Sequence, residues 1–188
     1  PSNYQPSKPF EIRWDRPDSR LLVLLNVKYV VSPGEINEAG INFVCRDENG
    51  LGLYQRERYN PRAYVVSTVE YVANRVEALN RICGLDFDLR HSAVVEGLRK
   101  VGWSGANRND DTNSSAQIKL RSNNGLTVVV KCERESFLVL SEVFTSGWEA
   151  TIDGQRTEIY RANGFLRAVR IPAGKHHVVF KFSPRSLH

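Results

Sequence analysis

Apolar and polar residues alternate through the C-terminal part of the chain. Every second residue is apolar in Trp148–Asp153 and again in His176–Ser183. This period of two is typical of strands with one buried face and one face in water. Turn sequences that favour positive φ or a sharp reversal separate the runs, at Asp153-Gly154, Asn163-Gly164 and Pro172-Ala173-Gly174. The pattern predicts a β-meander over Phe137–Pro184.

Another hairpin is predicted upstream of this segment. Apolar residues alternate in Ala116–Leu120 and in Leu126–Cys132, and the turn sequence Asn123-Asn124-Gly125 lies between the two runs. An antiparallel sheet with one apolar face needs a second sheet to cover that face. We therefore expect an antiparallel, jelly-roll-like β-sandwich from about residue 114 onward.

The first half of the chain has a different pattern. Leu21–Val31 is a continuous apolar run that stops at Ser32-Pro33-Gly34, which predicts a buried strand. Three further strands are predicted at Gly52–Arg58, Arg62–Thr68 and Ser92–Glu96.

One helix is predicted in this half. Asn74 is a suitable N-cap because Glu77 follows at the third position, and Gly84 ends the pattern. Apolar residues recur between them at helical spacing, at Val76, Leu79 and Ile82 or Cys83. The alternative start is Ser67, which Glu70 follows, but β-branched residues dominate residues 64–72.

The composition shifts to Gly, Asn, Asp and Ser between Gly102 and Ser115, which marks a loop. The predicted organisation is a mixed α+β segment over residues 1–103, a polar loop over 104–115 and a β-sandwich meander over 116–188. We expect the segments to pack as one unit, so the predicted fold class is mainly β with one helix.

Composition narrows the class of protein. Of 188 residues, 41% are hydrophobic and 25% are charged, as in an ordinary globular protein. The longest apolar run contains Asn26 and Lys28 and is too short to cross about 30 Å of hydrocarbon. The chain begins at Pro1, lacks methionine and carries no signal peptide, so we expect it to be a piece of a longer protein.

The formal net charge is +5, but lysine and arginine are scattered along the chain. We expect no nucleic-acid partner, because no predicted helix carries a basic stripe. Solubility accounts for the charge, and attraction to anionic lipid headgroups is the alternative.

No signature of a metal, cofactor or catalytic site is present. The three cysteines form no CxxC pair and the four histidines lie in no HxxxH or HExxH frame, so we expect neither zinc nor another cofactor. One disulfide is compatible with the count, but the patterns at Cys83 and Cys132 favour buried thiols. Asp86 and Asp88 are explained as solvated charges, and no GxSxG or P-loop sequence occurs, so no catalytic residue is expected.

Sugar binding is the function for which the chain offers candidate residues, because jelly-roll domains present aromatic and polar side chains to glycans. We assign candidate carbohydrate contacts to Trp103, Tyr160 and Arg161. Trp148 shares its strand face with Ala150 and Ile152, which favours a role in core packing over a ligand platform.

Six segments, in the same order, resemble the C-terminal region of YfhO-like bacterial membrane proteins. They are Leu24–Val31, Asn60–Val66, Asn74–Gly84, Phe87–Gly97, Gly147–Gln155 and Arg161–Pro184. The family is similar to multi-pass GT-C-type glycosyltransferases that take sugars from polyprenyl-phosphate carriers outside the cytoplasm. The resemblance implies a domain on the extracytoplasmic face of the cell membrane, periplasmic or at the cell surface.

The chain departs from the family at Thr145-Ser146, where a Tyr-Pro pair is common. Catalytic carboxylates of GT-C enzymes lie in early loops between membrane helices, so the resemblance transfers no catalytic residue to this chain. We expect an accessory module that binds a cell-envelope glycan or a polyprenyl-phosphate-linked sugar, or that supports the membrane part of the same parent chain. The alternatives are a freestanding carbohydrate-binding or cell-surface interaction module and, more remotely, an extracytoplasmic hydrolase.

Overall fold

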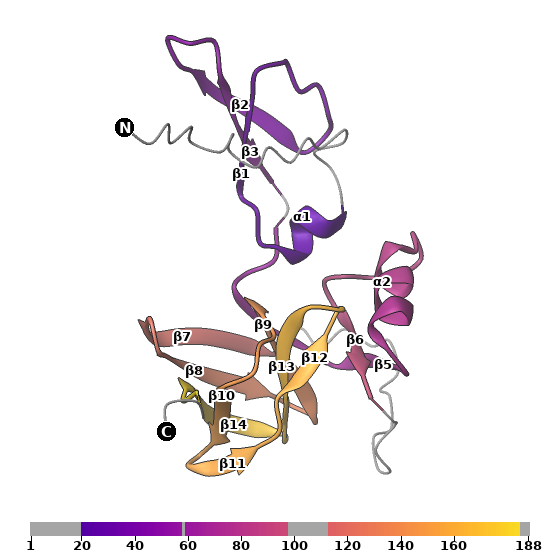
Figure 1. Cartoon of the computed structure of the whole chain (residues 1–188), viewed down its shortest axis with the longest axis vertical. Coiled ribbons are helices and arrows are strands. Elements are labelled where there is room, and N and C mark those ends of the chain that lie inside the picture. Colours follow the sequence, from indigo (N-terminus) through magenta and orange to yellow (C-terminus); the bar gives the residue numbers. More distant parts are fainter. Residues whose placement is uncertain (1–19, 58, 98–112, 185–188) are drawn as a thin grey trace, which may run out of the picture.

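The computed structural model describes residues 20–57, 59–97 and 113–184. Most of the described strands lie in two facing β-sheets, from which a smaller sheet projects (Figure 1). The described part of the chain is mainly β, with two helices, so the predicted fold class is confirmed.

The first sheet of the sandwich has five strands, and all of its pairings are antiparallel. Its strands, in spatial order, are β11 (Gln155–Thr157), β10 (Trp148–Ile152), β14 (Gly174–Phe182), β8 (Gly125–Cys132) and β7 (Ser115–Ser122). The predicted upstream hairpin is therefore present as β7 and β8, and β14 pairs with β8 over most of its length.

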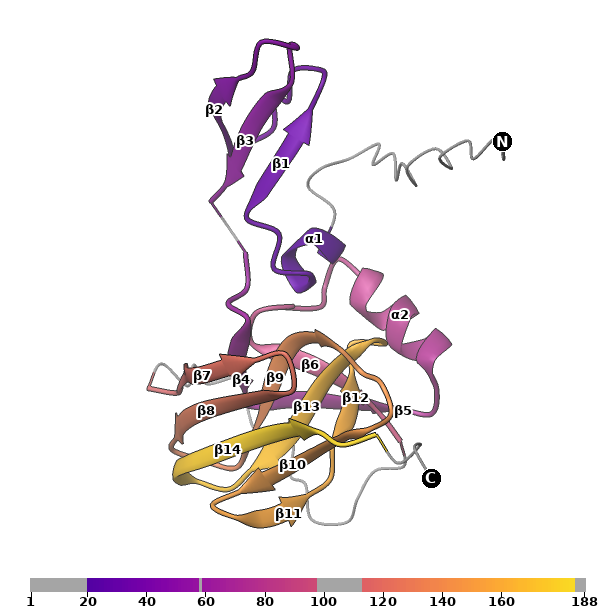
Figure 2. The same ribbon diagram turned by 60° about the vertical axis from the view of Figure 1, so that its left-hand side comes forward.

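The second sheet has six strands and draws on both halves of the chain. Its strands, in spatial order, are β4 (Ala63–Val66), β9 (Ser136–Val143), β13 (Leu166–Ile171), β12 (Tyr160–Ala162), β6 (Ser92–Glu96) and β5 (Thr68–Val72). Strands β5 and β6 pair in parallel through the helix-containing connection between them, and the other neighbours are antiparallel. Figure 2 shows the five-stranded sheet in front of this one.

The core lies between the two sheets. Fully buried side chains from β8, β9, β13 and β14 form one cluster there, including Val128, Leu138, Val169 and Phe180. The six-stranded sheet also buries its other face, where Phe137 and Val139 pack with Ala93 and Val95. Burial on both faces explains why Phe137–Leu140 is continuously apolar rather than alternating.

The predicted meander is divided between the sheets. Strands β10, β11 and β14 lie in the five-stranded sheet, whereas β9, β12 and β13 lie in the other. Only β10 with β11 and β12 with β13 form hairpins between consecutive strands in this segment. The chain therefore passes repeatedly between the layers, an arrangement that local turn signals do not specify.

The predicted helix is present as α2 (Arg75–Cys83). The side chain of Asn74 accepts a hydrogen bond from the Glu77 N–H, as a capping box requires. Ala78 and Ile82 are buried against β6, but Val76 is 66% exposed, so the predicted apolar face was wrong at that position. Strand β5 occupies Thr68–Val72, which excludes the alternative helix start at Ser67.

The predicted buried strand over Leu21–Val31 was wrong. Residues Arg20–Leu24 form the short helix α1, and β1 begins only at Tyr29. Asn26 ends the helix with φ of 57°, and Val27 donates a backbone hydrogen bond to Leu22 at 3.0 Å, which is the Schellman pattern. Because Leu24 packs on α2 and β6, tertiary contacts stabilise a turn of helix in a β-rich sequence.

Strand β1 (Tyr29–Ser32) joins β2 (Ile41–Arg46) and β3 (Gly52–Arg56) in a three-stranded sheet. This sheet extends away from the sandwich in both views (Figure 1, Figure 2). Buried Asn60 lies where the chain enters the sandwich, and its amide donates to the Leu89 carbonyl at 3.2 Å.

The predicted tight turns have the expected backbone. Residues Asp153 and Asn163 have φ of 51°, and Gly154 and Gly164 follow them with φ of 86° and 77°. Asn163 does more than turn the chain, because it is fully buried and its Oδ1 accepts a hydrogen bond from the Val94 N–H at 2.9 Å. This bond ties the β12–β13 hairpin to β6.

Replacing Asn163 tests this double role. Asn163→Ala removes the acceptor for Val94 and puts alanine, which tolerates positive φ less well than asparagine, at this position, so we expect it to lower the free energy of unfolding by about 2–4 kcal/mol. Asn163→Gly removes the acceptor but tolerates the backbone, so its cost should be smaller by about 1 kcal/mol. Chemical denaturation measures both, and equal costs would show that the turn conformation is not a constraint.

Candidate functional site

A β-bulge creates the most unusual polar arrangement in the sandwich. On β13, Leu166 pairs with Val143 but Arg167 pairs with Leu140, so Ser141 and Glu142 form an irregularity on β9. Bulges redirect side chains and are frequent beside functional sites. Here the bulge brings the carboxylate of Glu142 to the guanidinium of Arg167.

Arg167 occupies a position of the core. Arg167 lies on the same face of β13 as Val169 and Ile171, both of which are buried between the sheets. Its own side chain is only 4% exposed. Its Nη2 donates to Glu142 Oε2, and its guanidinium lies 3.9 Å from the centroid of the Trp148 ring. Burial lowers the pKa of Arg167, and the Glu142 charge opposes this effect.

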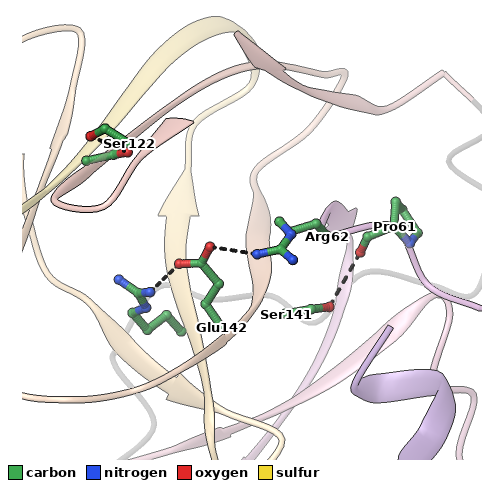
Figure 3. A network of polar contacts seen from close by, with 7 residues as sticks. Pro61, Arg62, Ser122, Ser141 and Glu142 are labelled. Carbon is green, nitrogen blue, oxygen red and sulfur yellow. Dashed lines mark hydrogen bonds and ion pairs between the residues drawn. The ribbon is translucent and has the colours of Figure 1, made fainter. Parts of the chain in front are cut away.

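Glu142 serves two arginines. Its other oxygen, Oε1, accepts a hydrogen bond from Arg62 Nη1 at 3.3 Å (Figure 3). Arg62 is held at the start of β4, because its carbonyl accepts a hydrogen bond from the Ser141 N–H at 2.8 Å. One carboxylate thus lies between two guanidinium groups that come from β13 and from the residue before β4.

These residues line a groove of about 1020 Å³ at one end of the sandwich. We call it the arginine groove, and its polar and aromatic lining consists of Arg62, Arg121, Ser122, Asn123, Ser141, Glu142, Thr145, Trp148 and Arg167. The turn between β7 and β8 contributes Ser122 and Asn123, and the bulge contributes Ser141 and Glu142. Residues distant in the sequence therefore meet at this edge.

A smaller hollow of about 260 Å³ adjoins the groove and shares Thr145 and Trp148 with it. Glu149 in this hollow pairs with Arg156, whose Nη2 lies 3.1 Å from the carboxylate. The carboxylates of both cavities are thus bound by arginines, and each cavity contributes one carboxylate. This arrangement does not provide the two cooperating acids of a glycoside hydrolase, and it favours binding of an anion over proton transfer.

The structure accounts for two of the predicted carbohydrate contacts by internal interactions. Tyr160 packs edge-on against Phe137 with ring centroids 5.5 Å apart. Arg161 lies 3.0 Å from Glu96 and stacks 4.8 Å from the centroid of the Phe144 ring. Neither residue lines the two cavities described above. Trp103 lies outside the described residues, so all three assignments stay predictions.

Trp148 both packs against the core and lines the cavities, the two roles considered for it from the sequence. It packs against the core cluster beside Phe182, as its alternation with Ala150 predicted. It also lines both cavities, with the Arg167 guanidinium over its ring face. The signal that could have revealed this site is an arginine in an inward-facing position of a strand, at Arg167.

The cysteines and histidines have structural surroundings. Cys132 is buried as predicted, and its thiol donates a hydrogen bond to the Pro172 carbonyl. Cys83, at the end of α2, and Cys45, on β2, are exposed, and the three cysteines form no disulfide with one another. His176 pairs with Asp153 at 2.7 Å and His91 with Asp88 at 2.7 Å. Within the described ranges, no group of three such ligands lies close enough to hold a metal ion.

Comparison with protein families matches residues 107–188 to the family described as bacterial membrane protein YfhO. The C-terminal segment of this chain is similar to the YfhO family. The matched YfhO-like segment includes Arg121, Glu142, Trp148 and Arg167 of the groove, whereas Arg62 lies before it. Searches of curated proteins and of solved structures found no match. Among the described residues, the helices are too short or too polar to cross a bilayer.

Replacing Glu142 tests whether it balances a buried charge. Glu142→Gln leaves Arg167 without a counter-ion, so we expect the free energy of unfolding to fall by about 1–3 kcal/mol. The matched control is Glu149→Gln, which breaks a more exposed ion pair and should cost about 0–1 kcal/mol. Denaturant titration compares them, and equal losses would contradict the central role of Glu142.

The Asp153–His176 pair predicts a pH dependence of stability. The hydrogen bond to Asp153 raises the pKa of His176, and the same bond lowers the pKa of Asp153. The His176 contribution is complete below the ordinary histidine pKa of about 6.5 and is lost as pH rises through the raised pKa. The Asp153 contribution is present above its ordinary pKa of about 3.8 and is lost as pH falls through the lowered pKa.

We therefore expect His176→Asn to destabilise the protein more at about pH 5.5 than at about pH 9. His177→Asn is the control, because the His177 side chain is exposed on the neighbouring position of β14. The free energy of unfolding of each variant, measured at both pH values, tests this expectation. A His176→Asn effect that did not change with pH would show that the pair is not charged.

Proposed function

We propose that this chain is an extracytoplasmic module of a multi-pass membrane protein that resembles lipid-linked-sugar glycosyltransferases. Its role there is accessory, to hold a cell-envelope glycan or a polyprenyl-phosphate-linked sugar, or to support the membrane part of its parent chain. The observation that carries the proposal is the match of residues 107–188 to a bacterial membrane protein family. The matched strands form much of a folded β-sandwich.

The arginine groove supports the glycan-binding part of the proposal. Its volume of about 1020 Å³ can accommodate a small saccharide. Hydroxyl and amide groups of Ser122, Asn123 and Ser141 line it, and such groups exchange hydrogen bonds with sugar hydroxyls. Trp103, Tyr160 and Arg161 remain additional predicted contacts for the same ligand.

The cavities support a module without catalysis of its own. Their two carboxylates, Glu142 and Glu149, are bound by arginines rather than left open to a substrate. The chemistry of the parent protein would then lie in its other parts. The alternative is a freestanding carbohydrate-binding module. The location of the chain in the cell distinguishes this alternative from a module of a membrane protein.

The thiols of this chain provide the test of location. In intact cells that make the parent protein, a membrane-impermeant maleimide should label the exposed Cys45 and Cys83. Cys132 is 2% exposed and should react only after denaturation, which makes it an internal control. Mass spectrometry of the modified peptides reads out each thiol.

A Cys45→Ser, Cys83→Ser variant should lose the labelling of the native protein. Labelling that appears only after the membrane is permeabilised would place the module inside the cell and overturn the proposal. Labelled protein that fractionates away from membranes, with no larger parent chain, would favour the freestanding module.

A further inference from the structure

The lining of the arginine groove has an excess of positive charge. Arg62, Arg121 and Arg167 line it with Glu142 as the one carboxylate among its lining residues. Glu142 is shared between Arg62 and Arg167. Arg121 is exposed at the end of β7 and makes no ion pair within the described part of the chain. The groove therefore offers more cationic donors than the protein itself uses.

The hydrogen bonding of Arg167 points to a ligand independently of the excess positive charge. Its Nε and Nη1 are buried without a hydrogen-bond partner among the described residues, while Nη2 is bound to Glu142. Buried donors without partners are rare and costly in folded proteins. The Arg167 side chain is 4% exposed, lies beside the groove and has two donors without partners, so it is suited to bind the acceptor oxygens of a ligand.

The chemistry of the site selects the class of ligand. Guanidinium groups bind phosphate and carboxylate oxygens through paired hydrogen bonds. The Asn123 amide can donate to and accept from sugar hydroxyl groups. The hydroxyl groups of Ser122 and Ser141 donate to the Gly125 and Pro61 carbonyls, and their oxygens can still accept hydrogen bonds. Stacking of a flat ring on Trp148 is disfavoured, because the Arg167 guanidinium already lies 3.9 Å from its ring centroid.

Resting on the proposed glycan-binding role, we infer that the arginine groove binds an oxyanion carried by a saccharide, a sugar phosphate or a sugar carboxylate. The anion lies against Arg62, Arg121 and Arg167, and the sugar hydroxyls face Ser122, Asn123 and Ser141. Glu142 holds two of the arginines in place without neutralising the whole groove. The bulge at Ser141-Glu142 thus positions the binding residues.

Calorimetric titration of the purified chain at low ionic strength tests the inference. The titrants are glucose 1-phosphate, glucuronate, glucose and inorganic phosphate. We expect glucose 1-phosphate or glucuronate to bind more tightly than both glucose and inorganic phosphate. Binding should weaken as salt is raised, because exposed Arg121 contributes to it.

Arg121→Gln is the principal variant, because its side chain is exposed and the change does not disturb the core. We expect it to weaken binding by about tenfold to a hundredfold. Arg75→Gln on α2 removes the same charge from an exposed site outside the groove and should bind as the unmodified chain does. Arg167→Gln should abolish binding, and its circular dichroism spectrum and melting curve show whether it folds.

Each outcome decides the inference. Binding of a charged sugar that Arg121→Gln weakens and Arg75→Gln preserves supports it, and the tighter of the two charged sugars identifies the anion. Equal weakening by both variants would show attraction to net charge alone and overturn it. Inorganic phosphate that binds as tightly as the sugar phosphate would overturn the role of the sugar.

Failure of this inference is separable from failure of the proposed function. Glucose that binds as tightly as the charged sugars would overturn the anion site but keep a glycan-binding module. Absence of binding by all four titrants would overturn the inference, while thiol labelling in cells would still decide where the module lies. Cytoplasmic labelling would overturn the proposed function whatever the titrations show.

Discussion

Strand β9 is the element on which the rest of the structure depends. Its residues Ser136–Leu140 are all fully buried, because the strand has β4 on one side, β13 on the other and apolar layers on both faces. Each buried apolar side chain of this kind contributes about 1.5–3 kcal/mol. The early strand β4 and the late strand β13 are thus held by the same central strand, which joins the two halves of the chain.

At the end of β9, the residues of the buried core are followed directly by residues that line the arginine groove. After Leu140 the bulge at Ser141 and Glu142 interrupts pairing with β13, and polar groups replace apolar ones. Arg167 still lies in line with the buried residues of β13, so a charge is placed at the margin of the core. Such a charge is tolerated because Glu142 and the Trp148 ring contact it, and the same proximity to the core orients it rigidly.

Much of the local structure was predictable because it depends on neighbours in the sequence. Asn74 and Glu77 predicted the start of α2, and Asp153-Gly154 and Asn163-Gly164 predicted turns whose φ values are positive as expected. The errors occurred where distant contacts decide. Leu24 forms a helical turn because it packs on α2, and Leu120 is 66% exposed because a bulge interrupts the β7–β8 register after Ile118. Local periodicity contains no signal for either contact.

The amino-acid sequence by itself determined most strands of the C-terminal half, the turns and the one long helix, but it did not predict β2 or β5. It also carried a resemblance to YfhO-like proteins that the family match supports over residues 107–188. Only the tertiary structure decided which strands pair and therefore which polar residues meet. Arg62, Arg121 and Glu142 lie far apart in the sequence and resemble ordinary surface charges, and only Arg167 stands at an inward-facing strand position. The stacking of two sheets and one bulge bring them to a single groove, since register and layer packing, not local propensity, set the position of every side chain at the sandwich edge.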